Sequence, residues 1–399
     1  MPRVIFFVDS PFCQRDYKRY GMDVFLQNGF DIMVWDLSLA LHPQLQGKFI
    51  LSDQVTWHKH IIFKTKQEVV AALNQCPNDT YIINTLNYNG DTFCIYRALS
   101  KNNIPYFVTA VSVFLPFTLN STIKSKLLRY LKVFNPNKLK SYVLQRLPLR
   151  YLNILPAKFV IAEGLKCNIK RPEVASTTKM VRTHSLDYDI YLSLKNNPVN
   201  NPDNTWVYLD NYLVYHSDAL FSGEKLPITP KRYYKELCQF FDVLEKNHQC
   251  KIIIAAHPRS QYDTMPDLFD KRPVIKGKTA ELVQQAKAVI VSFSTSITFP
   301  VLYKKPIIFF TTDELNNYRI TQVNYMKLIH DLAALFGKKP INISSAVEDD
   351  LKVDLRMDDV KYNDYCNHYI KAHGSDDLPF WQIICNEINA DQKQGIAHG

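Results

Sequence analysis

The chain has 399 residues, of which 46% are hydrophobic and 22% charged, so it is neither disordered nor small enough for one ordinary core. Its net charge of +10 favours an anionic partner, while its 11 glycines argue against a glycine-rich phosphate loop. GxGxxG is absent, and RPVIKGKT (272–279) has Arg272 in place of the first P-loop glycine, so no ATP site of that kind is expected.

Cysteine usage and the N-terminus both predict a cytoplasmic protein. The eight cysteines are scattered without a CxxC pair, which fits neither a disulfide framework nor a zinc site. The opening MPRVIFFVDSPF lacks the cleavage region of a signal peptide and is typical of a first strand. Residues 102–123 carry no charge, but Pro105 and Pro116 interrupt them. Any membrane contact is therefore expected at the surface, at the inner face of the cytoplasmic membrane.

Apolar runs alternate with helical segments through the first half of the chain. Strands are expected at 3–9, 30–38, 60–65, 80–85, 104–112 and 157–164, and helices at 15–29, 66–75 and 90–100. The run at 157–164 is expected to be the last strand of this half. Continuous apolar strands between helices predict a parallel sheet with both faces covered.

A long basic window follows these elements. No acidic residue occurs between Asp91 and Glu163, and segment 123–150 predicts one or two amphipathic helices, interrupted at Pro136. The positive residues of the window are Arg97, Lys101, Lys124, Lys126, Arg129, Lys132, Lys138, Lys140, Arg146, Arg150 and Lys158. The window favours a polyanion, such as nucleic acid, anionic lipid headgroups or a phosphorylated substrate, over a merely solvated helix face.

The alternation restarts after a polar stretch rich in asparagine and proline. We expect a first domain at 1–192, a linker at 193–205, a second domain at 206–375, and a terminal helix with a frayed tail at 376–399. In the second half, strands are expected at 206–210, 251–257, 273–277, 287–292, 305–312 and 341–344, and helices at 231–247, 279–286, 295–303, 325–336 and from about 358 and 376. The pattern predicts two Rossmann-like, doubly wound α/β domains facing a cleft, with ligands at the carboxyl ends of the strands.

Polar side chains follow the strands of the second half. Asp210 follows one strand, His257-Pro258-Arg259 another, and SFSTS (292–296) a third. Hydroxyls at a strand-to-helix turn, joined by an imidazole and a guanidinium, form a phosphate site without glycine. Taken singly, Ser294 or Thr295 fits an ordinary helix N-cap and His257 a structural histidine.

The His-Pro pair after an apolar strand, followed by a Ser/Thr cluster after a later strand, resembles the bacterial sialyltransferase-type glycosyltransferases of the GT-B fold. The resemblance implies an inverting, metal-independent transfer from a CMP-activated acidic sugar, sialic acid-like or Kdo-like. It implies that His257 assists the leaving phosphate and that Ser294, Thr295 and Ser296 hold it. Pro258, Arg259, Ser292, Asp210 and Lys278 complete the expected donor-binding set. HSLDYDIYL, YLDNYLVYHSDA and FSTSITFPVLYKKPIIFF also resemble uncharacterised bacterial surface-polysaccharide biosynthesis proteins, which implies a capsule, O-antigen or lipooligosaccharide product.

One part of that family pattern is missing. The acidic D/E-D/E-G motif that supplies the general base is absent, and AEG offers only Glu163. Inverting transfer still needs a carboxylate to take the acceptor proton. Asp16 and Asp91 are the candidates, with Asp9 and Glu163 behind them, although a surface charge or an N-cap explains each one singly. The Asp-X-Asp of Asp187–Asp189 is not expected to bind metal.

Several functions stay open on the sequence. The leading one is a glycosyltransferase whose partners are a nucleotide sugar, a glycan or lipid-linked acceptor, and an anionic membrane contacted through 123–150. No cofactor beyond the nucleotide sugar, no metal and no nucleic acid are expected. The alternatives are a UDP- or GDP-sugar transferase on the same scaffold, a basic protein that binds nucleic acid or membranes without catalysis, and a scaffold that has kept only the fold.

Overall fold

A computed structural model describes residues 2–45, 55, 57–110, 136–167, 169, 171–199, 203–215, 228–265, 267–317, 325–344 and 351–397. The described chain forms two compact units. Of the described residues, those up to His184 and from His373 onward belong to the first unit, and those within Ser185–Ala372 belong to the second unit. The expected segment 123–135 of the basic window, with Lys124, Lys126, Arg129 and Lys132, lies outside the described residues.

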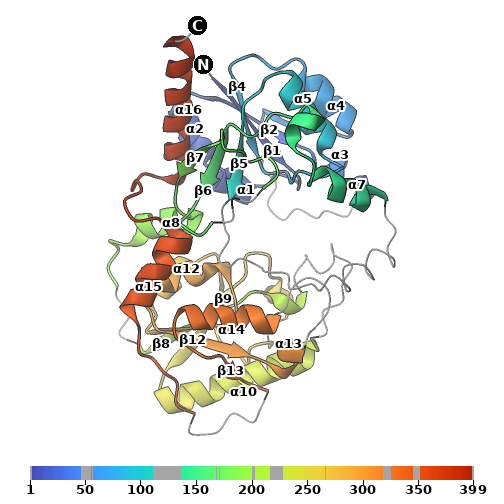
Figure 1. Ribbon diagram of the computed structural model, residues 1–399. Coiled ribbons are helices and arrows are strands. Elements are labelled where there is room, and N and C mark those ends of the chain that lie inside the picture. The colour runs from blue at the N-terminus through green and yellow to red at the C-terminus, as the bar shows by residue number, and fades with distance from the viewer. Residues whose placement is uncertain are drawn as a thin grey trace. The chain divides into compact units, whose positions relative to one another are not determined.

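The first unit is built on a seven-stranded parallel sheet in the order β3-β2-β1-β4-β5-β6-β7 (Figure 1). Its strands are β1 (Arg3–Val8), β2 (Asp31–Asp36), β3 (His60–Ile62), β4 (Thr80–Asn84), β5 (Tyr106–Ala110), β6 (Phe159–Ala162) and β7 (Lys179–Arg182). Its helices are α1 (Gln14–Arg19), α2 (Met22–Gln27), α3 (Ser38–Leu41), η1 (Pro43–Leu45), α4 (Lys66–Leu73), α5 (Phe93–Lys101), α7 (Pro136–Leu144) and η2 (Leu149–Leu152). The central strands are buried on both faces, as their unbroken apolar sequences predict.

Two local predictions for this unit are wrong. The helix expected at 15–29 is two helices, because Gly21 adopts φ +57 and ends the first. Residues 157–164 do not hold the last strand, since β7 follows β6 and extends the sheet. The interruption expected at Pro136 is not tested, because α7 is described from Pro136 onward and residues 111–135 lie outside the described residues.

The second unit holds a six-stranded parallel sheet in the order β10-β9-β8-β11-β12-β13. Its strands are β8 (Thr205–Leu209), β9 (Lys251–Ala256), β10 (Val274–Lys276), β11 (Ala288–Val291), β12 (Ile307–Thr311) and β13 (Ile341–Asn342). Its helical segments are α8 (Leu186–Leu194), η3 (Leu213–Tyr215), α10 (Pro230–His248), η4 (Tyr262–Thr264), α11 (Thr279–Gln285), η5 (Thr295–Ile297), α12 (Thr298–Leu302), α13 (Asp313–Asn317), α14 (Tyr325–Leu335), α15 (Asp359–Tyr365) and η6 (Cys366–Ile370). Two parallel, doubly wound sheets confirm the predicted fold class.

Within the described residues, the chain passes between the units at two points. The first lies between His184 and Ser185, so α8 belongs to the second unit, whereas the sequence placed its residues in the first domain. There α8 packs on α11 and α12. The second lies between Ala372 and His373, after which α16 (Phe380–Ala397) returns to the first unit.

The returning helix α16 is held by both apolar and charged contacts. The Trp381 ring lies 5.6 Å from that of Phe6 and 5.7 Å from that of Phe25, and α16 runs beside α2 (Figure 1). Asp391 accepts hydrogen bonds from the Tyr81 hydroxyl at 2.5 Å and from Lys158 Nζ at 2.6 Å. Within the described residues, none of the helices combines the length and apolarity needed to cross a membrane.

Candidate functional site

The carboxyl edge of the second sheet brings together three of the segments singled out in the sequence. β8 lies between β9 and β11, and the strand order reverses between β8 and β11. Such a reversal opens a crevice at the carboxyl ends of the strands, where doubly wound proteins bind ligands. Asp210 and Asn211 follow β8, His257 follows β9, and Ser292 follows β11.

Asp210 is the buried anchor of this edge. Its Oδ1 accepts a hydrogen bond from the Tyr212 backbone N–H at 3.0 Å, and its Oδ2 accepts from the His257 N–H at 3.2 Å and the Tyr262 hydroxyl at 3.0 Å. Burial raises the pKa of Asp210 to about 6, although these three donors oppose the shift. The carboxylate therefore ties the loop after β8 to the loop after β9.

His257 is half-buried, and its ring orientation is set by its own turn. Nδ1 accepts a hydrogen bond from the Arg259 backbone N–H at 3.2 Å, so the neutral ring carries its proton on Nε2. The ring lies parallel to that of Tyr212, at 7° and 6.3 Å between centroids. Pro258 and Arg259 are exposed beyond the strand end, as the sequence predicted for a strand that stops at an open edge.

The serine-rich turn after β11 is joined to β8 by Asn211. The Asn211 side-chain amide donates to Ser292 Oγ and to the Phe293 carbonyl, each at 3.2 Å. Ser292 is buried, whereas Thr295 is exposed and Ser294 and Ser296 are half-buried. Ser294 is the N-cap of η5, and its Oγ accepts from the Ser296 N–H at 3.2 Å. Because η5 and α12 are short, the hydroxyl groups of this turn would contribute more to binding an anion than the dipole of either helix.

Lys278 stands apart from this group. It precedes α11 and follows β10, the edge strand, so β9 lies between its strand and β8. The structure thus brings together Asp210, His257, Arg259 and the 292–296 turn at one sheet edge, and places Lys278 at the margin of that edge.

The candidate bases of the first unit occupy different environments. Asp16, in the first turn of α1, accepts from Cys13 Sγ at 3.2 Å, and Asp91 forms a 3.0 Å ion pair with Lys66 Nζ. Glu163 is buried directly after β6. Asp9 follows β1, which lies beside β4 where the first sheet's strand order reverses. Removal from water raises the pKa of Asp9, although its side chain still reaches solvent.

Two groups were missed at the sequence level. The Tyr262 hydroxyl donates a hydrogen bond to Asp210, 52 residues earlier in the chain, and no local sequence pattern indicates such a contact. Asp36, the buried last residue of β2, accepts from the Ser38 N–H at 2.8 Å and lies 3.5 Å from His60 Nε2. The signal for Asp36 was available, because it is an acid at the carboxyl end of an apolar strand.

Metal ligands do not gather anywhere in the described residues, which contain no cluster of three His, Cys, Asp or Glu side chains suited to an ion. The Asp-X-Asp at Asp187 and Asp189 lies within the first turn of α8. Residues two apart on a helix do not face each other, so this pair does not form a metal-binding loop.

Comparisons with known proteins find similar structures, but at low sequence identity. No protein-family model matches the chain, and no curated protein matches it. The UDP co-structure of MnaA from S. aureus is 10% identical with a TM-score of 0.47, covering 100% of this chain and 97% of that one. Phytolacca americana UGT2, complexed with UDP-2fluoro-glucose and pterostilbene, is 9% identical with a TM-score of 0.48, covering 98% and 99%. MurG from acinetobacter baumannii is 11% identical with a TM-score of 0.47, covering 98% and 100%. The fold class of this chain rests on its own two sheets.

Proposed function

We propose that this protein is a nucleotide-sugar-dependent glycosyltransferase of the GT-B type, which transfers its sugar with inversion and without a metal. The observation that supports it is the convergence of His257, Asn211 and the 292–296 turn at the carboxyl edge of β9, β8 and β11. A phosphate at this edge would meet imidazole and guanidinium donors from the loop after β9 and hydroxyl donors from the turn after β11. The donor is proposed to be a CMP-activated nonulosonic or Kdo-like acid.

The second unit would act on the leaving group. As the bond between the anomeric carbon and the phosphate oxygen breaks, negative charge develops on the nucleotide phosphate. His257 Nε2–H, the Arg259 guanidinium and the hydroxyls of Ser294, Thr295 and Ser296 are proposed to stabilise that charge. Asp210 fixes the His257 turn, so its contribution is to hold these donors in place.

The first unit would supply the base. The acceptor hydroxyl gives its proton to a carboxylate as its oxygen bonds to the anomeric carbon. Asp16 and Asp91 are retained as candidates, and Asp9 joins them on two grounds. It follows the strand beside the reversal of the first sheet, and its raised pKa brings it closer to the pH at which a base works. Asp91, by contrast, is already paired with Lys66.

The biological setting is proposed from the sequence resemblance alone. The acceptor would be a glycan or lipid-linked glycan, and the product a bacterial surface polysaccharide, made at the inner face of the cytoplasmic membrane.

Nucleotide binding tests the donor. Calorimetric titration with CMP, UDP and GDP should show CMP binding most tightly, and His257→Ala should weaken that binding about tenfold or more, in line with the loss of one charge-assisted contact. If the protein binds UDP or GDP more tightly than CMP, the proposed CMP-linked donor is wrong, but the proposed phosphate site stands. If neither the wild type nor His257→Ala binds any of the three nucleotides, the proposed site itself is wrong.

Turnover tests the base. Asp9→Asn, Asp16→Asn and Asp91→Asn should be compared in a transfer assay with the acceptor present, and loss of general-base catalysis should lower kcat by about 10²–10⁴-fold in one of them only. Nucleotide affinity should be unchanged in all three. If the sugar is epimerised without an acceptor and is not transferred when the acceptor is present, the reaction is an isomerisation and the transferase proposal is wrong.

A further inference from the structure

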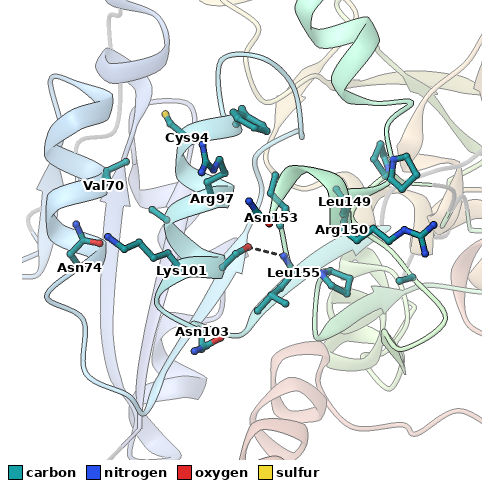
Figure 2. A pocket seen from close by; sticks show the side chains of 18 residues that line it. Val70, Asn74, Cys94, Arg97, Lys101, Asn103, Leu149, Arg150, Asn153 and Leu155 are labelled. Carbon is teal, nitrogen blue, oxygen red and sulfur yellow. Dashed lines mark hydrogen bonds between the residues drawn. The ribbon is translucent and has the colours of Figure 1, made fainter.

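A pocket of about 1050 Å³ lies in the first unit (Figure 2), and none of its lining residues is among those proposed for catalysis. Its walls come from α4, α5 and segment 148–156, and none of its lining residues belongs to a strand. Segment 148–156 is fixed against α5 by a 2.8 Å hydrogen bond from the Leu155 N–H to Ser100 Oγ, drawn as a dashed line in Figure 2. The pocket is therefore a feature of the helical layer rather than of the sheet edge.

The charge of this pocket is wholly positive. Arg97, Lys101 and Arg150 line it, and no aspartate or glutamate is among its lining residues. Within the described residues these three cations form no ion pair; the Arg97 guanidinium lies 5.9 Å from the Phe93 ring centroid, and that of Arg150 lies 4.8 Å from that of Tyr151. Arg97 and Lys101 are also four residues apart on α5, a spacing at which like charges repel. An anion between them would relieve that repulsion.

The floor and surroundings of the pocket are apolar. Phe93, Leu149, Ile154 and Leu155 contribute to its lining. Next to it, segment 142–155 exposes an unusual set of large hydrophobic side chains: Tyr142 (40%), Val143 (46%), Leu147 (42%), Tyr151 (68%) and Leu155 (49%). Arg146 and Arg150 are interspersed among them, each lying over the ring of a tyrosine, Tyr142 and Tyr151 respectively.

This combination matches a bilayer surface. Tyrosines beside arginines suit the headgroup layer, and exposed aliphatic side chains suit the acyl boundary beneath it. The sequence from 92 to 162 has no acidic residue that would repel an anionic leaflet. A nucleic acid would neutralise the same cations but would leave Val143, Leu147 and Leu155 exposed to water.

We propose that the pocket between α5 and segment 148–156 is a binding site for the phosphate headgroup and upper acyl chain of an anionic phospholipid, with segment 142–155 lying on the membrane around it. Arg97 and Lys101 receive the phosphate, and the apolar floor receives the chain. The proposal gives the expected membrane contact a defined site. It does not depend on any step of the transfer reaction, because it is tested without nucleotide sugar.

Vesicle sedimentation of the full chain measures the headgroup contribution. The protein should bind phosphatidylcholine vesicles that contain phosphatidylglycerol far more tightly than pure phosphatidylcholine vesicles. The double variant Arg97→Gln/Lys101→Gln should weaken that binding about 30-fold, at about 1 kcal/mol per cation near an anionic surface. The matched control is Lys231→Gln/Lys235→Gln, which removes the same charge at the same spacing from the exposed side of α10 and should have little effect.

A second pair of variants measures the apolar contribution. Leu155→Ser should weaken vesicle binding roughly fivefold to tenfold, because about one buried leucine side chain is lost from the interface. Val360→Ser, at a still more exposed valine on α15 in the second unit, is the control. Thermal unfolding of all four variants should match the wild type, since every substituted side chain is exposed.

The pocket itself is followed through Cys94, an exposed thiol among its lining residues. Anionic vesicles should slow the modification of Cys94 by a membrane-impermeant thiol reagent, and the Arg97→Gln/Lys101→Gln variant should lose this protection. Three results would overturn the proposal: equal binding to both kinds of vesicle, equal loss in the α10 control, or salt-sensitive binding of RNA or DNA with indifference to vesicles.

Discussion

The carboxylate of Asp210, buried after β8, accepts a hydrogen bond from the backbone N–H of His257 after β9 at 3.2 Å. The same oxygen accepts from the Tyr262 hydroxyl at 3.0 Å. One acid residue thereby fixes the turn that presents the imidazole to the open edge of the second sheet.

Asp210→Asn should destabilise the protein and weaken nucleotide binding together. The amide can present its oxygen to only one side, so its NH₂ group would face N–H or O–H donors on the other, at a cost of about 1–3 kcal/mol. Denaturant unfolding and calorimetric titration measure the two effects. Tyr262→Phe is the graded control, since it removes one donor and leaves the His257 N–H bond intact. Wild-type nucleotide affinity in Asp210→Asn would show that the His257 turn does not depend on this acid.

The free energy of unfolding should depend on pH through the titration of Asp210. Its folded pKa of about 6 lies above its ordinary value of 3.8, so the folded state holds the proton more tightly than the unfolded state. The associated stability is fully present below about pH 4 and is lost as the pH rises through about 6, amounting to about 2–3 kcal/mol. Unfolding free energies measured between these pH values should fall more steeply for the wild type than for Asp210→Asn. Identical slopes would mean that Asp210 does not titrate in this range.

Ser294→Ala should separate a structural cap from a phosphate ligand. Loss of the bond that Ser294 Oγ accepts from the Ser296 N–H should cost about 1 kcal/mol of folding free energy. If the hydroxyl also binds phosphate, CMP affinity should fall about tenfold in addition. Thr298→Ala is the comparison, because its hydroxyl bonds the Thr295 carbonyl in the same turn and is not a proposed ligand. A loss of stability with unchanged affinity would leave Ser294 with the cap role only.

Gly21→Ala should loosen the attachment of α16. The added Cβ would lie 2.2 Å from Trp381 Cδ1, and the residue would have to keep φ +57, which side chains disfavour. We expect a loss of about 2–4 kcal/mol in unfolding free energy, together with faster proteolysis after residue 373. Gly29→Ala is the matched control: it shares a positive φ of +78 but meets nothing within 4 Å, and should cost only about 1 kcal/mol. Equal losses in both variants would mean that the Trp381 contact contributes nothing.

The sequence by itself determined most of the local structure. Unbroken apolar runs such as IIIAA (252–256) predicted buried parallel strands, because only a sheet covered on both faces buries every side chain of such a run. The carboxyl ends of those strands then located His257, Asp210 and Ser292 at one edge, since all strands of a doubly wound sheet point the same way.

Only the tertiary structure decided which distant segments meet. The break at Gly21 accompanies the packing of Trp381, 360 residues later, and the Asp210 site is completed by Tyr262 from beyond the next strand. β7 was missed because its four residues, KMVR, carry too little apolar pattern to stand out, and it forms by pairing with β6. Local sequence encodes backbone preference and the alternation of faces, whereas these contacts depend on how whole elements pack together once the sheets have formed.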